Sequence, residues 1–121
     1  MKKHLIIYAI LSLIHISTFA QWVQQNSGTL NQLVSVCFID QNTGFTVGGE
    51  GTILKTIDGG NTWVTQNSGT TYSLREVDFL NSNNGYVVGS QSNNTSPLSY
   101  TSIILKTTNG FLYQQNNANR I

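Results

Sequence analysis

The chain has 121 residues, a formal net charge of +1, 9% charged residues and one cysteine. This length suffices for one small domain, and so few charges exclude the strongly basic surface with which proteins bind nucleic acid. A single cysteine also excludes an intrachain disulfide, and Cys37, which lies in an apolar run, is expected to act as a small buried hydrophobe rather than to pair between chains.

The N-terminus has the three-part organisation of a signal peptide. Lys2 and Lys3 precede an apolar run of about twelve residues, 5–16, and small or polar residues then lead to Ala20. A membrane-spanning helix needs roughly twenty apolar residues, so cleavage after Ala20 is favoured over a permanent anchor. The sequence therefore predicts a signal-peptide helix, export to the periplasm, cell surface or medium, and no stable membrane anchor after cleavage.

An internal repeat follows the leader. "WVQQNSGT" (22–29) returns as "WVTQNSGT" (63–70), and from Trp22 to Gly49 fourteen of twenty-eight positions are identical at an offset of 41 residues. A polar insert over 91–102 then raises the offset to 51, because "IILKTTNG" matches "TILKTIDG". We expect the insert to be a lengthened surface loop.

Each repeat holds four short apolar runs rich in β-branched and aromatic residues, which favours strands. In the first unit they are residues 33–39, 45–49, 52–56 and 62–66, each followed by turn residues. A four-stranded unit recurring at 41 residues is typical of a β-propeller blade. The predicted fold class is all-β, with antiparallel four-stranded propeller blades.

Propellers close with about four to eight blades, so two repeats predict an incomplete propeller. The expected division is a signal peptide (1–20), an orphan outer strand with a linker (21–32), a first blade (33–70), a second blade containing the insert (71–117) and a tail (118–121).

The stretch "TIDGGNTW" connects the third and fourth predicted strands and is expected to form a hairpin turn. Asp58 is predicted to accept hydrogen bonds from backbone N–H groups two residues further on, while Gly59 and Gly60 supply positive φ angles. Trp63 offers an apolar face that can cover the hairpin.

These residues resemble a known motif. The pattern Thr56-x-Asp58-x-Gly60-x-Thr62-Trp63 resembles the Asp-box hairpin of sialidase-like (BNR-type) propellers. Together with the preceding "GFTVGGEG", the phrase "GTILKTIDGGNTW" resembles the repeat of photosystem II stability/assembly-factor-like propellers and is similar to xyloglucanase-type propellers; this likeness covers Trp22 to Gly110. It implies a structural turn at the blade periphery, away from any catalytic centre.

The second copy of the turn is decayed. Thr107, Asn109 and Gly110 keep the motif loosely, and Asn109 stands where the first copy has Asp58. Asparagine still makes an Asx turn, so this exchange favours a structural over a catalytic aspartate.

No catalytic, cofactor or metal residues are predicted. Sialidase chemistry needs an arginine cluster, yet only Arg75 and Arg120 would remain after cleavage, and no histidine would remain as a base. The turns at 40–44 and 58–61 lack the spacing of known calcium loops. Aromatic residues suited to stacking on sugars recur at matched positions, which is more typical of a blade core.

The predicted function is that of an exported, non-enzymatic scaffold for protein binding or assembly. The alternative is the N-terminal part of a secreted glycan-binding or glycoside-hydrolase-type propeller whose active residues lie in further blades. The expected partner is an unknown protein or glycan, with self-association through open blade edges. No nucleic acid and no cofactor are expected.

Overall fold

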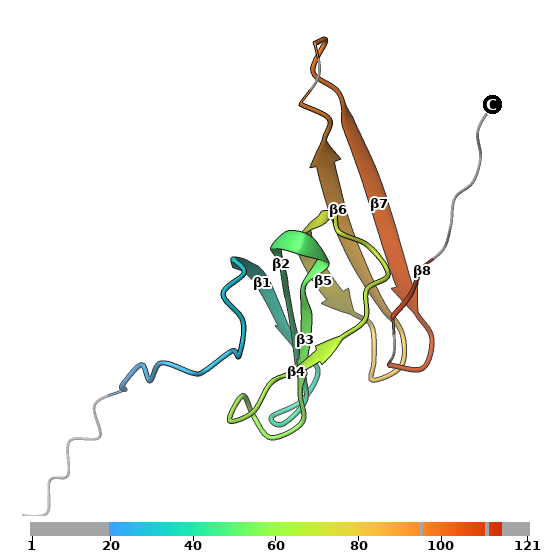
Figure 1. Ribbon diagram of the computed structural model, residues 1–121. Coiled ribbons are helices and arrows are strands. Elements are labelled where there is room, and N and C mark those ends of the chain that lie inside the picture. Colours follow the sequence, from blue (N-terminus) through green and yellow to red (C-terminus); the bar gives the residue numbers. More distant parts are fainter. Residues whose placement is uncertain (1–19, 95, 111, 115–121) are drawn as a thin grey trace, which may run out of the picture.

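The computed structural model describes residues 20–94, 96–110 and 112–114, which form two four-stranded antiparallel sheets (Figure 1). The first sheet contains β1 (Leu33–Phe38), β2 (Gly44–Gly48), β3 (Ile53–Thr56) and β4 (Val64–Gln66). The second contains β5 (Ser73–Phe79), β6 (Gly85–Ser92), β7 (Tyr100–Thr107) and β8 (Leu112–Gln114). A short 3-10 helix, η1 (Gly49–Gly51), joins β2 to β3. The predicted all-β class with four-stranded blades is confirmed, and we call the two sheets blade 1 and blade 2.

The expected leader, apart from Ala20, and the expected tail lie outside the described residues. Within the described part of the chain, no helix has the length and apolar character needed to cross a membrane.

The strand register repeats between the blades. In blade 1, Val36 pairs with Thr46, which pairs with Leu54. In blade 2, Val77 pairs with Val87, which pairs with Leu105. These rows are related by offsets of 41 residues in the first two strands and 51 in the third, so the sequence repeat is a repeat of hydrogen-bonding register as well.

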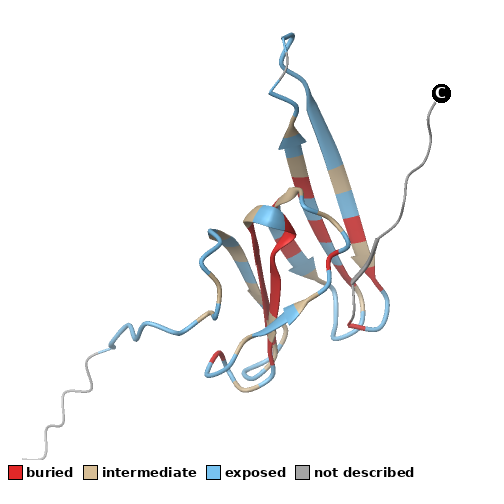
Figure 2. Cartoon of the chain, viewed as in Figure 1, coloured by how far each residue is buried: buried red, intermediate tan, exposed pale blue. Residues whose placement is uncertain are grey.

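The two blades pack face to face around one shared core. The Phe45 ring from β2 stacks on the Phe79 ring from β5, with centroids 4.1 Å apart and planes inclined by 15°. Figure 2 shows the buried positions concentrated on β2 and β3 and alternating with exposed positions along β6, while on β7 they lie near its C-terminal end. The buried core side chains are those of Phe45, Val47, Ile53, Leu74, Val77, Val87 and Leu105. Strands β1 and β5 lie side by side, and β2 also contacts β5.

The structure differs from the sequence prediction over residues 21–32. No strand forms in this segment, and Trp22 is fully exposed. A strand needs a neighbouring strand to accept its backbone hydrogen bonds, and no described strand lies alongside residues 22–25 as β3 lies alongside β4.

The insert is also different from the expected surface loop. Part of it is strand, because β6 and β7 extend beyond their blade 1 counterparts through the pairs Ser90↔Ser102, Gln91↔Thr101 and Ser92↔Tyr100. Residues 93–99 form the connection at the tip. Period-2 patterning is weak in this polar stretch, so its extended pairing gave no sequence signal.

One glycine is required by close backbone packing. A Cβ on Gly48, at the end of β2, would lie 1.8 Å from the Gln32 carbonyl oxygen. The same oxygen accepts the Gly49 N–H at 2.9 Å, so it cannot withdraw without breaking that bond. A Cβ on the neighbouring Gly49 would lie 4.0 Å from the oxygen, in ordinary contact.

We therefore expect Gly48→Ala to reduce the free energy of unfolding by about 1–3 kcal/mol, the usual effect of overpacking. Gly49→Ala is the matched control and should stay within about 1 kcal/mol of the wild type. Urea unfolding of the three proteins measures both effects. Equal losses in the two variants would contradict the assignment of the clash to position 48.

Candidate functional site

The Asp-box residues form a closed hydrogen-bond network between β3 and β4. Oδ1 of Asp58 accepts the Thr62 N–H at 2.9 Å and the Thr56 hydroxyl at 2.8 Å, while Oδ2 accepts the Thr62 hydroxyl at 2.6 Å. The aspartate thus spans the turn from the end of one strand to the approach of the next. It uses both carboxylate oxygens on the protein's own groups.

Thr56 is the second centre of this network, and the sequence did not identify it as one. Its buried hydroxyl oxygen accepts the Gly60 N–H at 2.9 Å and the Asp58 N–H at 3.3 Å. The prediction that Asp58 accepts N–H groups two residues further on is therefore wrong, because the Gly60 N–H donates to the Thr56 hydroxyl oxygen instead. Gly59 and Gly60 adopt φ angles of 72° and 93°, in the region that glycine tolerates best.

Hydrogen bonding lowers the pKa of Asp58 below its ordinary value. The Thr62 hydroxyl is the largest cause, followed by the Thr62 N–H and the Thr56 hydroxyl, since each donor favours the charged carboxylate. In the β1–β2 loop, the N–H groups of Asn42 and Thr43 lower the pKa of Asp40 in the same way. Both carboxylates are suited to holding turns as anions, not to exchanging protons near neutral pH.

Trp63 packs over the turn. Its ring lies within van der Waals reach of Gly60, where an added Cβ would lie 3.6 Å from the ring. On its other side it meets Phe38 of β1 edge to face, with centroids 6.1 Å apart. The indole therefore links the Asp-box turn to the first strand of the blade.

The second turn keeps the outline of the first with weaker bonding. The Thr107 hydroxyl is 3.5 Å from Oδ1 of Asn109, against 2.8 Å for the corresponding bond in blade 1. The Gly110 N–H donates to the Asn83 carbonyl, just as the Gly59 N–H donates to that of Asn42. Docking of the turn on the loop between the first two strands of its blade is thus common to both repeats.

The "NSGT" turns are a second repeated device. The Gly28 N–H donates to Oδ1 of Asn26 at 3.0 Å, and the Gly69 N–H donates to Oδ1 of Asn67 at 2.9 Å. In each turn the serine hydroxyl donates to the following threonine carbonyl, at 3.2 and 3.1 Å. The repetition of "NSGT" is the sequence feature from which this turn could have been predicted.

The second "NSGT" turn fastens the connection between the blades. The Gly51 N–H of η1 donates to the Tyr72 carbonyl at 3.0 Å, and a Cβ on Gly51 would lie 1.9 Å from the Thr70 carbonyl oxygen. The turn and η1 are therefore in direct backbone contact. Glu50, between the two glycines of η1, has a φ of 53°, which is uncommon for a residue with a side chain.

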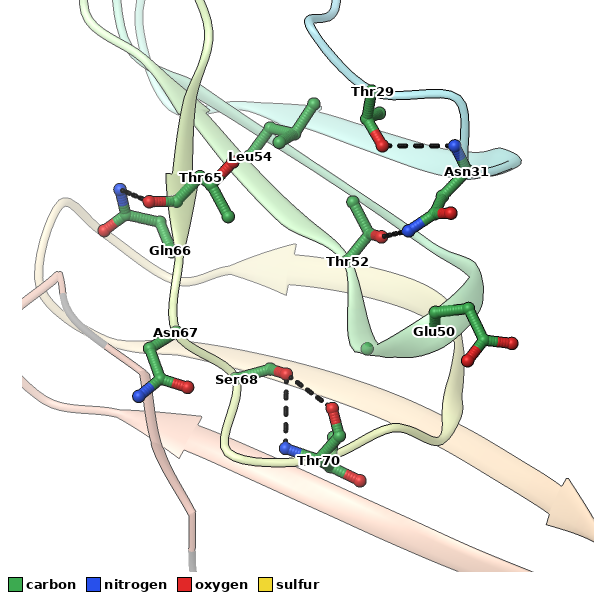
Figure 3. A pocket seen from close by; sticks show the side chains of 11 residues that line it. Thr29, Asn31, Glu50, Thr52, Leu54, Thr65, Gln66, Asn67, Ser68 and Thr70 are labelled. Carbon is green, nitrogen blue, oxygen red and sulfur yellow. Dashed lines mark hydrogen bonds between the residues drawn. The ribbon is translucent and has the colours of Figure 1, made fainter.

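A polar groove of about 530 Å³ lies between the two "NSGT" segments (Figure 3). Asn31 reaches from one side and donates its amide to the Thr52 hydroxyl at 2.8 Å. Among the described residues that line the groove, Glu50 is the charged one. The lining residues are Thr29, Asn31, Glu50, Gly51, Thr52, Leu54, Thr65, Gln66, Asn67, Ser68 and Thr70. Such a lining offers many donors and acceptors for a polar segment of chain.

The predicted site residues of the first turn, Thr56, Asp58, Gly60, Thr62 and Trp63, thus come together, whereas Glu50 and the groove were not anticipated. Within the described ranges, no group of three or more histidine, cysteine, aspartate or glutamate side chains is placed to hold a metal ion. Cys37 is half-buried and packs against the shared core.

The two aspartate turns allow a paired test. Oδ1 of Asp40 accepts the Asn42 and Thr43 N–H groups at 2.7 Å, and Oδ1 of Asn81 accepts the matching pair of N–H groups in blade 2. Because an asparagine keeps that oxygen, we expect Asp40→Asn to change the thermal midpoint little. Asp58→Asn converts Oδ2 to an NH₂ group facing the Thr62 hydroxyl and should lower the midpoint clearly more at pH 7. Calorimetry measures the difference.

The deficit of Asp58→Asn should depend on pH. Since folding lowers the pKa of Asp58, its stabilisation is fully present above the ordinary value of 3.8 and is lost as pH falls through the folded-state pKa. The midpoints of wild type and variant should therefore converge below about pH 4. A gap that stays constant from pH 7 to pH 2 would contradict the proposed bonding.

Comparison with known proteins places these features in a family. The family model described as photosynthesis system II assembly factor YCF48 matches residues 14–118. A solved structure of YCF48 bound to D1 peptide is 25% identical with a TM-score of 0.57, and the match covers 81% of this chain and 33% of that one. A structure of YCF48 from Cyanidioschyzon merolae is 24% identical with a TM-score of 0.60, covering 82% and 31%, and shows the shared fold. No curated protein sequence matches the chain.

This chain spans about a third of the length of those two solved relatives. The resemblance to photosystem II stability/assembly-factor-like propellers is confirmed by the family match and by the YCF48 structure bound to D1 peptide. The chain belongs to the family of photosynthesis system II assembly factor YCF48.

Proposed function

We propose that this chain is an exported, non-enzymatic scaffold that binds a segment of a protein partner. The observation that carries the proposal is the bound peptide in a solved YCF48 structure, whose blades match 81% of this chain. Family membership supports a role in assembly. Export is supported by the three-part organisation of residues 1–20.

The groove beside η1 is the place where this chain is best suited to hold such a segment. Its amide and hydroxyl groups can pair with the backbone of an extended peptide, which is a general mode of peptide recognition. Glu50 supplies a carboxylate at the groove, so the preferred peptide carries a lysine or arginine near its centre. A glycan would be the competing ligand.

Binding of the chain, applied in solution to peptide and glycan arrays, tests the proposal. We expect saturable binding of extended peptides with a basic residue and no binding of glycans. Glu50→Gln should weaken peptide binding about two- to fivefold, which corresponds to loss of one exposed ion pair. Asp40→Asn is the matched control, because Asp40 is exposed in the β1–β2 loop and does not line the groove.

Glycan binding without peptide binding would overturn the proposal and favour the glycan-active alternative. Equal weakening by Glu50→Gln and Asp40→Asn would remove the groove as the site.

A further inference from the structure

The two blades pack on each other through two different faces. Because the sequence repeats, the outer face of each blade corresponds to the face that the other blade uses in this internal interface. Blade 1 packs on blade 2 through Phe45, Val47 and Ile53. The repeat places Tyr86, Val88 and Ile104 at the same positions of blade 2, at offsets of 41 and 51 residues, and these three side chains are exposed. The outer face of blade 2 is therefore of the kind that receives a following blade.

The outer face of blade 1 has the opposite character. Blade 2 packs on blade 1 through Val77, Phe79, Val87 and Leu105, and the repeat places Val36, Phe38, Thr46 and Leu54 at these positions of blade 1. Thr46 and Leu54 are already buried within the single chain. Val36 is 60% exposed and Phe38 is 46% exposed. Blade 1 thus presents outward the face that fits onto a preceding blade.

Finer details of the internal interface recur as well. Lys55 lies over the Phe45 ring at 5.3 Å, and Lys106 lies over the Tyr86 ring at 5.7 Å. The Ser35 hydroxyl accepts the Val77 N–H across the internal interface at 3.3 Å. Glu76 occupies the position of Ser35 in blade 2, and a carboxylate can accept the same kind of bond. These matches extend the likeness between the outer face of blade 2 and the internal face of blade 1 beyond their shared apolar character.

We propose that these faces join head to tail between copies of this chain, with the blade 2 face of one copy receiving the blade 1 face of the next. In this arrangement Tyr86 takes the place of Phe45 and stacks on Phe38 of the next copy. The contact is heterologous, because two different faces meet, and such contacts form rings when the rotation closes. Propellers close with about four to eight blades, so copies that each contribute the two described blades would close a ring of about two to four copies.

The inference does not depend on peptide binding, because it is carried by the internal interface alone.

Sedimentation velocity of the full-length chain, as purified and without added peptide, tests the proposal. We expect a discrete assembly of about two to four copies. Val36→Glu and Ile104→Glu each place a charge in one of the two faces, and each should weaken self-association about tenfold or more. Ile57→Glu is the matched control. Ile57 lies in the Asp-box turn and stays 72% exposed although blade 1 packs on blade 2, so packing between blades does not cover this position. Assembly of this variant should be unchanged.

Mixing the two variants separates head-to-tail packing from a symmetric contact. Val36→Glu keeps the blade 2 face and Ile104→Glu keeps the blade 1 face, so the mixture should form a one-to-one pair and nothing larger. A symmetric contact would leave one variant assembling alone, and this would overturn the proposal. A wild-type chain that stays monomeric at all concentrations would also overturn it. Peptide binding by the monomeric variants is measured separately, so failure of assembly and failure of the proposed function are distinguishable.

Discussion

The stacking of Phe45 on Phe79 is the contact around which the rest of the structure is arranged. A single four-stranded sheet has two faces and no interior, so each blade buries most of its apolar side chains against another blade. In this chain the buried apolar side chains of both sheets, apart from Leu54, meet in one cluster between them. The blades are consequently one unit of stability, and whatever holds β1, β2 and β5 in place supports both sheets. The outer faces lack that cover and are where partners can act.

The turns keep this packing in register, and they do so with bonds internal to the chain. Asp58 and Thr56 bind the two ends of the Asp-box hairpin, while Trp63 ties it to Phe38. The Thr70 and Tyr72 carbonyls contact η1 and fix where β5 begins relative to blade 1. The donors and acceptors named in these turns bind other groups of the same chain. Recognition of a partner therefore falls to the groove beside η1 and to the uncovered blade faces.

Much of this fold could be predicted from the sequence because equivalent positions of the two repeats pair in the same strand register. The four strands of blade 1 lie within two residues of their predicted limits, since β-branched runs bounded by glycine and asparagine leave little choice. The strand expected within residues 21–32 did not form, because a strand depends on a neighbour that composition does not reveal. Thr56 as a bonding centre was missed, since two hydroxyl acceptor bonds depend on the exact path of the turn. The groove was missed because it joins residues far apart in the sequence.

Because the two blades share one core, we expect them to fold as one unit. Native-state hydrogen exchange of the β2 and β6 amides measures this, in the wild type and in Phe45→Leu at concentrations where the chain is monomeric. Equal opening free energies are expected for the two strands, with an equal fall in both when the Phe45 ring is lost. Exchange that is faster in β2 alone, with β6 unchanged, would show that blade 2 is stable by itself and would contradict the account.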